Sequence, residues 1–407
     1  MRKLSLAGVA IATTLLIAGC TSSEATPVES SAPADASATA PGASATASAE
    51  AAPADGSAPG TGGSAVGFIF VGPKTDFGYN QAAYEGSQAI AAAFPDLEVL
   101  TQENVPEDDN AYRVMEGMIE RGAKILFATS YGHLQAAQKI AAAYPDVVVV
   151  QQGNYIEDPA LITPNIGTYF GTVFEPVYLA GIAAGKATTS NKLGYVYAFP
   201  IPQTVNNINA FEMGAKSVNP DAETYVVSTS SWCDPQKQKA AVDSLLSQGV
   251  DVISQHQDCT DTIIKATEAA GAYTVGYHAD ASSLAPAGWL TGSEWNWGPL
   301  YEDIVQTTVD GKFTGSPYNG NFRVGLQTGD NPFIQSVYGP SVAEETKAEI
   351  ATALETLAVP GASVFTGPLT DQDGAVKVEE GVALQYGDPG IEGMDWFVDG
   401  VVGKLAQ

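Results

Sequence analysis

The sequence predicts an α/β protein in which two lobes are each built on a parallel β-sheet. Short runs of mainly apolar residues alternate with longer helical stretches along most of the chain, and this alternation is typical of βαβ units. The runs are almost continuously apolar, as expected for strands that helices cover on both faces. The part from residue 65 to residue 407 is also longer than one compact core usually is, which predicts two lobes.

The first 20 residues have the pattern of a bacterial export signal. Arg2 and Lys3 precede an apolar run, Leu6 to Ile17, which is too short and too early for a membrane-spanning helix. The run ends in "LIAGC", the pattern of a lipoprotein cleavage site. We therefore expect Cys20 to be lipidated and to anchor the protein on the cell membrane, outside the cytoplasm. The alternative is a plain cleaved signal that happens to end in a cysteine.

Residues 21–64 contain almost only Ala, Ser, Thr, Pro and Gly with a few acids, and no aromatic or basic residue. A segment of this composition cannot bury a core, so it is predicted to be a disordered spacer between the anchor and the folded part. The whole chain has a net charge of −28 with only 18 Lys and Arg residues. This charge argues against a nucleic-acid partner and against direct adhesion to anionic lipid headgroups.

Seven runs are predicted to be strands, and a helix is expected between most of them. Glycines at the ends of several helical stretches agree with C-terminal helix caps. The strands are expected in "AVGFIFVG", "KILFAT", "DVVVVQQG", "KLGYVYAF", "TYVVSTS", "DVISQH" and "YTVGYH". The helices are expected at 80–94, 111–121, 134–144, 174–188, 205–218, 235–248 and 260–270.

Ligands of open parallel sheets bind beyond the carboxyl ends of the strands. The loops at those positions are rich in aromatic and amide residues: "GPKTDFGYN", "SYGH", "GNYIEDP", "FPIPQTVNN", "SSWCDP", "QHQDC" and "HADAS". We expect the binding site among them. No GxGxxG or Walker pattern occurs, so a phosphate cradle and a nucleotide cofactor are not expected.

Several longer segments resemble the basic membrane protein family, the substrate-binding lipoproteins of ABC importers that include purine nucleoside receptors. They are "VGFIFVGPKTDFGYNQAAYEG", "FATSYGHLQAAQKIAAAYPDV", "YLAGIAAGKATTSNKLGYV", "SSWCDPQKQKAAVDSLLSQGVDVI" and "GPLTDQDGAVKVEEG" with "MDWFVDGVVG". The resemblance implies a type I periplasmic-binding-protein fold with a crossover hinge. Its usual chain order assigns 65–187 and 281–318 to the first lobe, 188–280 and 319–367 to the second, and 368–407 to a tail across the hinge.

The resemblance also implies a ligand site between two aromatic rings. In nucleoside-binding relatives an aromatic residue in the first loop stacks on the purine and its polar neighbours bond the purine's edge. These roles fall on Tyr79, Asp76 and Asn80. The second stacking residue is implied at Trp232, in "SWCDP". Stacking contacts of this kind contribute about 1 to 3 kcal/mol each.

Two departures from the family pattern concern the sugar. Relatives that hold ribose have an acid after the strand "YTVGYHAD", where the nearest counterparts are His278 and Asp280, and a lysine in the segment that here reads "GSEWNWG". The lysine is replaced by the run Trp295-Asn296-Trp297, which favours a free purine base over a nucleoside. Because the two tryptophans alternate along an extended segment, one is expected to face the ligand and the other the core.

The same residues also have structural interpretations. Asp76 or Asn80 would cap a helix start, and Trp232 would be an ordinary core residue. Tyr131 follows a strand and is expected to face the cleft, while Ser130 before it would act as a helix cap. We assign eight residues to the ligand site at this point: Asp76, Tyr79, Asn80, Tyr131, Trp232, Asp280, Trp295 and Trp297.

Cys233 and Cys259 follow two strands that are expected to be neighbours, about 4.8 Å apart. In an exported protein we expect them to form a disulfide that joins the Trp232 loop to the loop with His256 and Asp258, both also placed in the ligand site. One alternative is a hydrolase in which Cys233, His256 and Asp258 act as nucleophile, base and orienting acid. A metal site at His256, Asp258 and Cys259 matches no known zinc spacing.

The sequence therefore predicts a monomeric capture protein without enzyme activity, cofactor or metal. It would close two lobes on a purine base or nucleoside and present it to an ABC permease in the membrane. The alternative is a sensor lipoprotein that presents its ligand to a signalling receptor.

Overall fold

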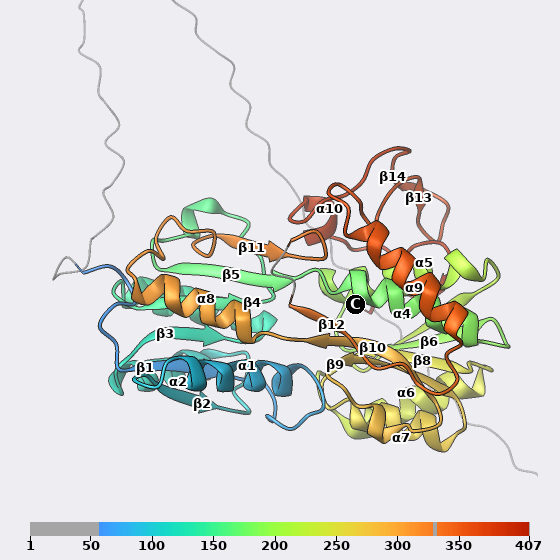
Figure 1. Cartoon of the computed structure of the whole chain (residues 1–407), viewed down its shortest axis with the longest axis horizontal. Helices are drawn as coiled ribbons and strands as arrows, with labels where there is room; N and C mark the ends of the chain where they lie inside the picture. The colour runs from blue at the N-terminus through green and yellow to red at the C-terminus, as the bar shows by residue number, and fades with distance from the viewer. Residues whose placement is uncertain (1–56, 329–331, 407) are drawn as a thin grey trace, which may run out of the picture. The chain divides into compact units, whose positions relative to one another are not determined.

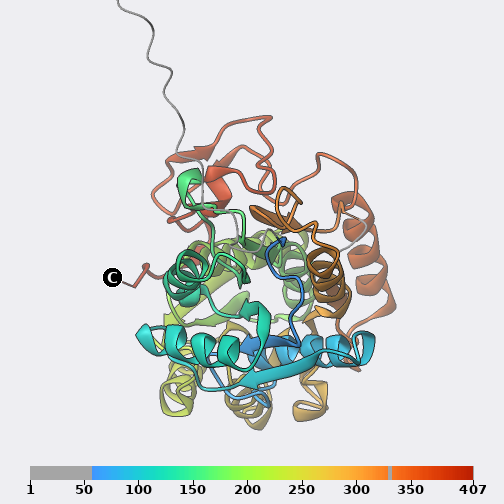
Figure 2. The same ribbon diagram turned by 90° about the vertical axis from the view of Figure 1, so that its left-hand side faces the viewer.

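The computed structural model describes residues 57–328 and 332–406. The export signal, Cys20 and the spacer up to residue 56 lie outside the described residues. The last eight residues of the expected spacer, 57–64, pack against the first lobe: Pro59 and Gly60 are buried, and the Gly60 N–H donates to the Asp146 carbonyl at 2.9 Å. The folded body thus begins before residue 65, and its first segment (dark blue) crosses the end of the first lobe (Figure 2).

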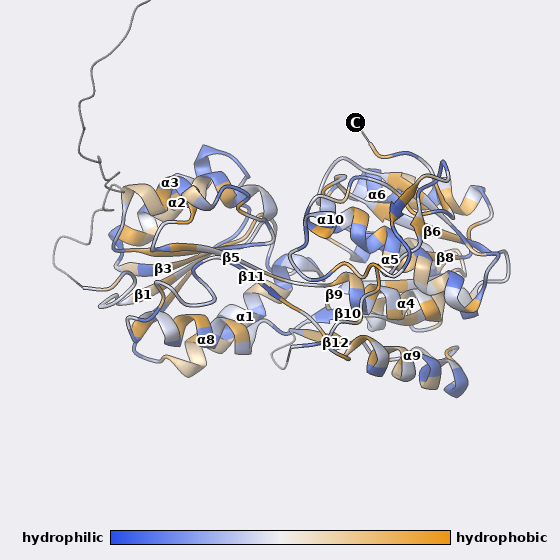
Figure 3. Ribbon diagram, turned by 90° about the horizontal axis from the view of Figure 1, so that it is seen from above, coloured by the Kyte–Doolittle hydropathy of each residue, from blue (hydrophilic) through white to orange (hydrophobic). Residues whose placement is uncertain are grey.

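The first lobe contains a six-stranded sheet in the order β11-β5-β4-β3-β1-β2, in which all neighbours are parallel. Helices α1 and α8 cover one face, and α2 and α3 cover the other (Figure 3). The strands are β1 (Ala65–Ile69), β2 (Glu98–Gln102), β3 (Ala123–Ala128), β4 (Val148–Gln152), β5 (Ile166–Gly171) and β11 (Asn321–Val324). The helices are α1 (Tyr79–Ala93), α2 (Asp109–Glu120), α3 (Leu134–Ala143) and α8 (Gly298–Val309).

The second lobe contains a seven-stranded sheet in the order β12-β10-β9-β8-β6-β7-β15, parallel except for β12 (Figure 1). Helices α4 and α5 pack against each other and α6 packs against α7. The strands are β6 (Lys192–Tyr197), β7 (Glu223–Ser228), β8 (Val252–His256), β9 (Tyr273–His278), β10 (Trp289–Trp295), β12 (Phe333–Gln335) and β15 (Val401–Val402). The helices are α4 (Phe174–Ala187), α5 (Pro202–Val218), α6 (Pro235–Ser247), α7 (Asp261–Ala269) and α9 (Glu344–Leu357).

The expected lobe boundaries are wrong at three elements. Helix α4, expected in the first lobe, packs on α5 and α9 of the second. Strand β10 lies within 281–318 but joins the second sheet, and β11 lies within 319–367 but joins the first. The physical reason is common to all three: the chain changes lobes at the ends of strands β5, β10 and β11, whereas the expected boundaries were placed at helix ends and in loops.

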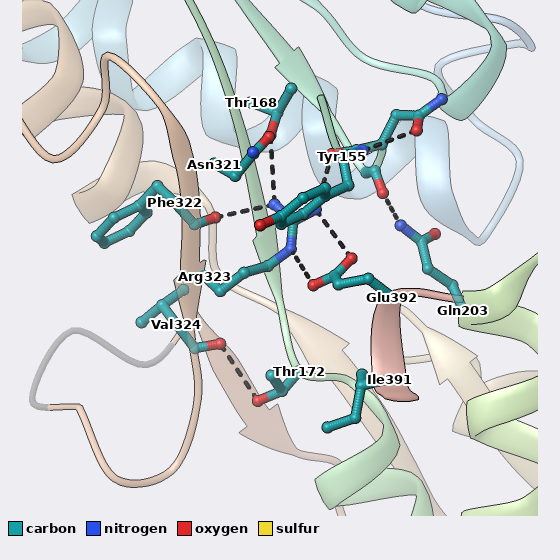
Figure 4. Close-up of polar contacts among 12 residues, drawn as sticks. Tyr155, Thr168, Thr172, Gln203, Asn321, Phe322, Arg323, Val324, Ile391 and Glu392 are labelled. Carbon is teal, nitrogen blue, oxygen red and sulfur yellow. Dashed lines mark hydrogen bonds and ion pairs between the residues drawn. The ribbon is translucent and has the colours of Figure 1, made fainter. Parts of the chain in front are cut away.

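The C-terminal tail contacts both lobes. It contains the hairpin β13 (Leu369–Thr370) and β14 (Val376–Val378) and the short helix α10 (Pro389–Glu392). Strand β15 pairs with β7, and Asn206 on α5 donates to the Ile391 carbonyl at 3.0 Å. Arg323 on β11 of the first lobe pairs with Glu392 at 2.9 Å (Figure 4). Within the described residues, no helix has the length and apolar character that a membrane crossing requires.

Candidate functional site: a cleft between the two lobes

A cavity lies where the strand ends of the two lobes meet. Its walls come from the loops after β1 and β3 in the first lobe and from those after β6, β7, β8 and β9 in the second. This is the position expected for ligands of parallel sheets. The lining residues are Val71, Tyr79, Ser130, Tyr131, Ile201, Gln203, Trp232, His256, Asp258 and His278.

Tyr79 is the first residue of helix α1, and Asp76 organises the turn before it. The Asp76 carboxylate is buried and accepts from the backbone N–H groups of Gly78, Asn80 and Gln81 at 2.9 to 3.1 Å. A carboxylate at a helix start satisfies amide donors that have no partner within the helix. Asp76 therefore has the capping role, and it presents Tyr79 to the cavity.

Asn80 links this turn to the second lobe. Its amide Nδ2 donates to Asp76 at 2.7 Å and to Asp258 at 2.9 Å, and its Oδ1 accepts from the Gly72 N–H. Asp258 lines the cavity and is 4% exposed. Burial, followed by the nearby Asp76 carboxyl, holds the pKa of Asp258 well above its usual range. Asp258 can thus donate or accept a hydrogen bond according to what binds beside it.

His256 is the last residue of β8, and a second side chain fixes its ring. The Asn207 amide donates to its Nδ1 at 3.1 Å, so the ring proton lies on Nε2. Burial lowers the pKa of His256 to about 3, so the ring is neutral at physiological pH. Within the described residues Nε2 makes no hydrogen bond, which leaves an N–H donor for a ligand.

His278 is the last residue of β9 and has a similar support. The indole Nε1 of Trp295 donates to its Nδ1 at 2.8 Å. Burial, and then the neighbouring His256, hold the pKa of His278 well below its usual value. Its backbone φ of +77° is uncommon for a residue with a side chain, and such positions often occur at binding sites. The Tyr79 ring meets the His278 ring edge-on at 5.1 Å.

Trp232 stands at the edge of the cavity, half-buried. Its ring lies 5.0 Å from that of Phe199 and 6.1 Å from that of His256. Its Nε1 donates across the cleft to Glu107 at 3.2 Å, and Glu107 also accepts from Ser130 Oγ at 2.5 Å. The two lobes are therefore joined at this edge by a single carboxylate.

The expected disulfide is present, but the expectation that its cysteines follow neighbouring strands is wrong, because β6 lies between β7 and β8. The loops after the two strands cross the end of β6 to meet. Cys233 and Cys259 are bonded, with their Cα atoms 5.4 Å apart. Each cysteine directly follows a lining residue, Trp232 or Asp258, and the Asp258 N–H donates to the Trp232 carbonyl at 2.9 Å. The bond removes the free thiol that the hydrolase alternative requires at Cys233.

Five of the ten residues placed in the ligand site line the cavity: Tyr79, Tyr131, Trp232, His256 and Asp258. Asp76 and Asn80 lie directly behind it, in the contacts described above.

The other three residues do not line the cavity. Asp280 is exposed and accepts from the Ser282 N–H. Trp295 lies behind His278, and Trp297 packs in the core against Tyr301. The two indoles stack 4.2 Å apart at 16°, so the expected alternation is wrong. The reason is that β10 ends at Trp295, and the strand geometry does not continue to Trp297.

Sequence reasoning missed five lining residues. The loop "FPIPQTVNN" was identified as a candidate, but nothing in it singled out Ile201 and Gln203; Pro202 at the start of α5 is the available signal. His278 was considered only as one of two counterparts of the acidic residue with which relatives hold ribose. Val71 and Ser130 carry no sequence signal for a ligand site, and neither does Glu107 at the edge of the cleft.

Comparison with known proteins identifies the family. A model described as "ABC transporter substrate-binding protein PnrA-like" (Bmp) matches residues 64–356. The chain belongs to this family. It is 32% identical to a purine-binding protein of Brucella abortus over 84% of this chain and 94% of that one. It is also 30% identical to a putative ABC transporter glucose-binding protein of Haloferax volcanii, over 83% and 80% of the two chains.

Solved structures agree with the fold. An ABC transporter solute-binding protein of Aeropyrum pernix has a TM-score of 0.63 at 17% identity, covering 72% of this chain and 91% of that one. A transcriptional activator of the comK gene from Bacillus halodurans has a TM-score of 0.62 at 23% identity, covering 73% and 99%. The chain is thus an ABC substrate-binding protein with a periplasmic-binding-protein fold, and its partners are a small molecule and a permease.

Proposed function

We propose that this substrate-binding protein captures a free purine base. The observation that carries the proposal is the chemistry of the cleft: aromatic rings on both lobes, one carboxyl group and two neutral imidazoles. A purine is flat and has both N–H donors and ring-nitrogen acceptors on its edges. Asp258 would pair with an N–H group, while Nε2 of His256 and of His278 would donate to ring nitrogens or a carbonyl.

The absence of a basic side chain among the lining residues supports a neutral ligand. The Tyr79 ring lies beside that of His278, and the Trp232 ring lies beside that of His256, so aromatic rings bound the space available to a ligand. The purine-binding relative from Brucella abortus points to the same ligand class. The glucose-binding relative is nearly as similar, so a sugar is the competitor that the experiment must include.

Titration calorimetry of the ligand-stripped protein against adenine, guanine, hypoxanthine, xanthine, adenosine, guanosine, inosine and glucose tests the proposal. We expect tight binding of at least one base and weaker binding of its nucleoside. Asp258→Asn keeps the bond from Asn80 on its Oδ1 but replaces the other oxygen by an NH2 group, which cannot accept from a purine N–H, and it should weaken base binding about tenfold or more. Asp280→Asn, outside the cavity, is the matched control and should leave affinity unchanged. Binding of glucose alone, or of no compound, would contradict the proposal.

We also propose that Cys20 carries a lipid that holds the protein at the outer side of the cytoplasmic membrane. The export signal and "LIAGC" support this. Membrane fractionation of cells expressing the wild type or Cys20→Ser tests it. The wild type should sediment with membranes, and the variant should not.

A further inference from the structure

Phe77 makes an unusual contact across the cleft. It belongs to the first lobe, between β1 and α1, yet its side chain packs into a small apolar cluster of the second lobe. The cluster consists of Ile264 on α7, Ala281 and Ala285 beside the short 3-10 helix Ser282–Leu284, and Trp289 on β10, with Leu284 partly buried at its edge. In Figure 1 the blue loop after β1 reaches the region of α7.

Hydrogen bonds to Thr260 hold the backbone around Phe77 in this position. The Thr260 N–H donates to the Asp76 carbonyl at 3.1 Å, and the Thr260 hydroxyl donates to the Phe77 carbonyl at 2.6 Å. Gly78 fits tightly beside them, because a Cβ there would lie 3.2 Å from Thr260 Cγ2. All of these contacts join the two lobes, so they can exist only when the cleft is closed.

The backbone of Phe77 is strained in this arrangement. Its φ is +51°, in the left-handed region that is unfavourable for a bulky residue. Such strain persists when the surrounding contacts compensate for it. Here the compensating contacts are the apolar cluster and the two hydrogen bonds from Thr260. The Phe77 N–H also donates to Gln81 Oε1 at 3.2 Å.

We propose that Phe77 is a closure latch, a positioning residue that stabilises the closed state without touching the ligand. This proposal depends on the proposed function in one respect: the lobes must close when a ligand binds. When the lobes separate, the Phe77 side chain and the cluster both become exposed to water, so their contact favours closure. Since Phe77 lies two residues before Tyr79, its insertion also fixes the stacking ring at the cavity. Apparent affinity depends on the fraction of closed protein, so it depends on this contact.

Amide hydrogen exchange of Thr260 tests the latch without any ligand. Its N–H is protected by the carbonyl of Asp76 on the other lobe, so its exchange reports opening. Phe77→Ala should accelerate this exchange about tenfold, whereas the N–H of Ile264, which bonds within the second lobe, should exchange as in the wild type. Phe77→Leu keeps an apolar side chain, so its exchange rate at Thr260 should lie between those of the wild type and Phe77→Ala. Phe94→Ala, at the other end of α1 and also partly buried, is the matched control for lost packing.

The affinity of the tightest-binding purine base supplies the second measurement. We expect Phe77→Ala to weaken the affinity for this base about tenfold. Phe94→Ala should lower thermal stability and leave the affinity unchanged. Wild-type exchange at Thr260 in Phe77→Ala overturns the latch, and so does an equal acceleration in Phe94→Ala. If no purine binds to the wild type, the purine proposal fails and the exchange rates alone decide the latch.

Discussion

The two walls of the cleft differ in chemistry. The first lobe lines it with Val71, Tyr79, Ser130 and Tyr131, none of which ionises near neutral pH, whereas the second lobe supplies Asp258 and both imidazoles. The two histidines and the backbone at Asp258 are also held from behind by other members of the second lobe, while the Asp258 carboxyl accepts from Asn80 of the first lobe. Asn207 and Trp295 fix the two histidines, and Gln238 donates to the Asp258 carbonyl at 2.7 Å.

This difference indicates that the second lobe makes the hydrogen bonds to the ligand and the first lobe supplies aromatic stacking. Hydrogen bonds are directional, so the lobe that makes them must hold its groups in place before the ligand arrives. Aromatic stacking tolerates small shifts, so the first lobe can deliver Tyr79 by a movement of the whole lobe. If the second lobe is the organised half of the site, changes to its supporting groups should have larger effects than changes in the first lobe.

The largest effect is expected from removing the disulfide. Replacing Cys233 and Cys259 by Ser opens a loop with a sequence separation of 26, which should cost about 3 kcal/mol of folding stability. Ligand affinity should also fall, because both bonded loops carry lining residues. Chemical denaturation and calorimetry measure the two quantities. An unchanged free energy of unfolding would show that the second lobe needs no covalent support.

Two stacked tryptophans, Trp295 and Trp297, permit a matched test of the hydrogen bond that holds the His278 ring. Trp295→Phe removes the N–H that bonds His278 and should cost about 1 to 3 kcal/mol of stability together with ligand affinity. Trp297→Phe is the control, because Trp297 Nε1 is buried without a partner within the described residues. Equal losses in the two variants would mean that ring packing, and not the hydrogen bond, matters.

The pH dependence of stability tests the neutral state of His256. Its folded pKa of about 3 lies below the unfolded value near 6.5, so the unfolded chain takes up the proton first. The contribution of His256 to stability is therefore complete above pH 6.5 and is lost as the pH falls toward the folded pKa. Between pH 6.5 and 5.5 the wild type should lose about 1 kcal/mol more than His256→Gln does.

Denaturation at the two pH values measures this difference. Asp258, whose pKa is raised, has the opposite dependence, but it is present in both proteins and its contribution cancels in the comparison. Parallel pH profiles would show that the pKa of His256 in the folded protein lies close to its unfolded value.

The smallest effect is expected in the first lobe. Within the described residues the Tyr131 hydroxyl has no hydrogen-bond partner, so Tyr131→Phe should change stability by less than about 0.5 kcal/mol and ligand affinity by less than about threefold. Thermal unfolding and calorimetry measure both. A large loss of affinity would give the first lobe a directional contact and remove the contrast between the walls.

The α/β class, the two lobes, the loops that form the cleft, the family and the Cys233–Cys259 bond could all be predicted from the amino-acid sequence. The α/β class and the cleft loops follow from local patterns, namely apolar strand runs and helix ends; the two lobes follow from chain length, and the family from a resemblance over long segments. The disulfide was predicted because its cysteines follow strands expected to be neighbours; the pairing is right, although β6 lies between those strands, β7 and β8. The capping interpretation of Asp76 was also open to sequence, since it depends on amides only a few residues away.

Which side chains of those loops reach the cavity depends on the three-dimensional fold and could not be predicted. His278 turns into it through a backbone with positive φ, and β10 ends early enough to leave both tryptophans behind it. Glu107 and Phe77 meet partners more than 100 residues away, at Trp232 and in the second-lobe cluster. The direction of a side chain at a strand end depends on one or two dihedral angles, and contacts between lobes depend on how they close; local sequence patterns encode neither.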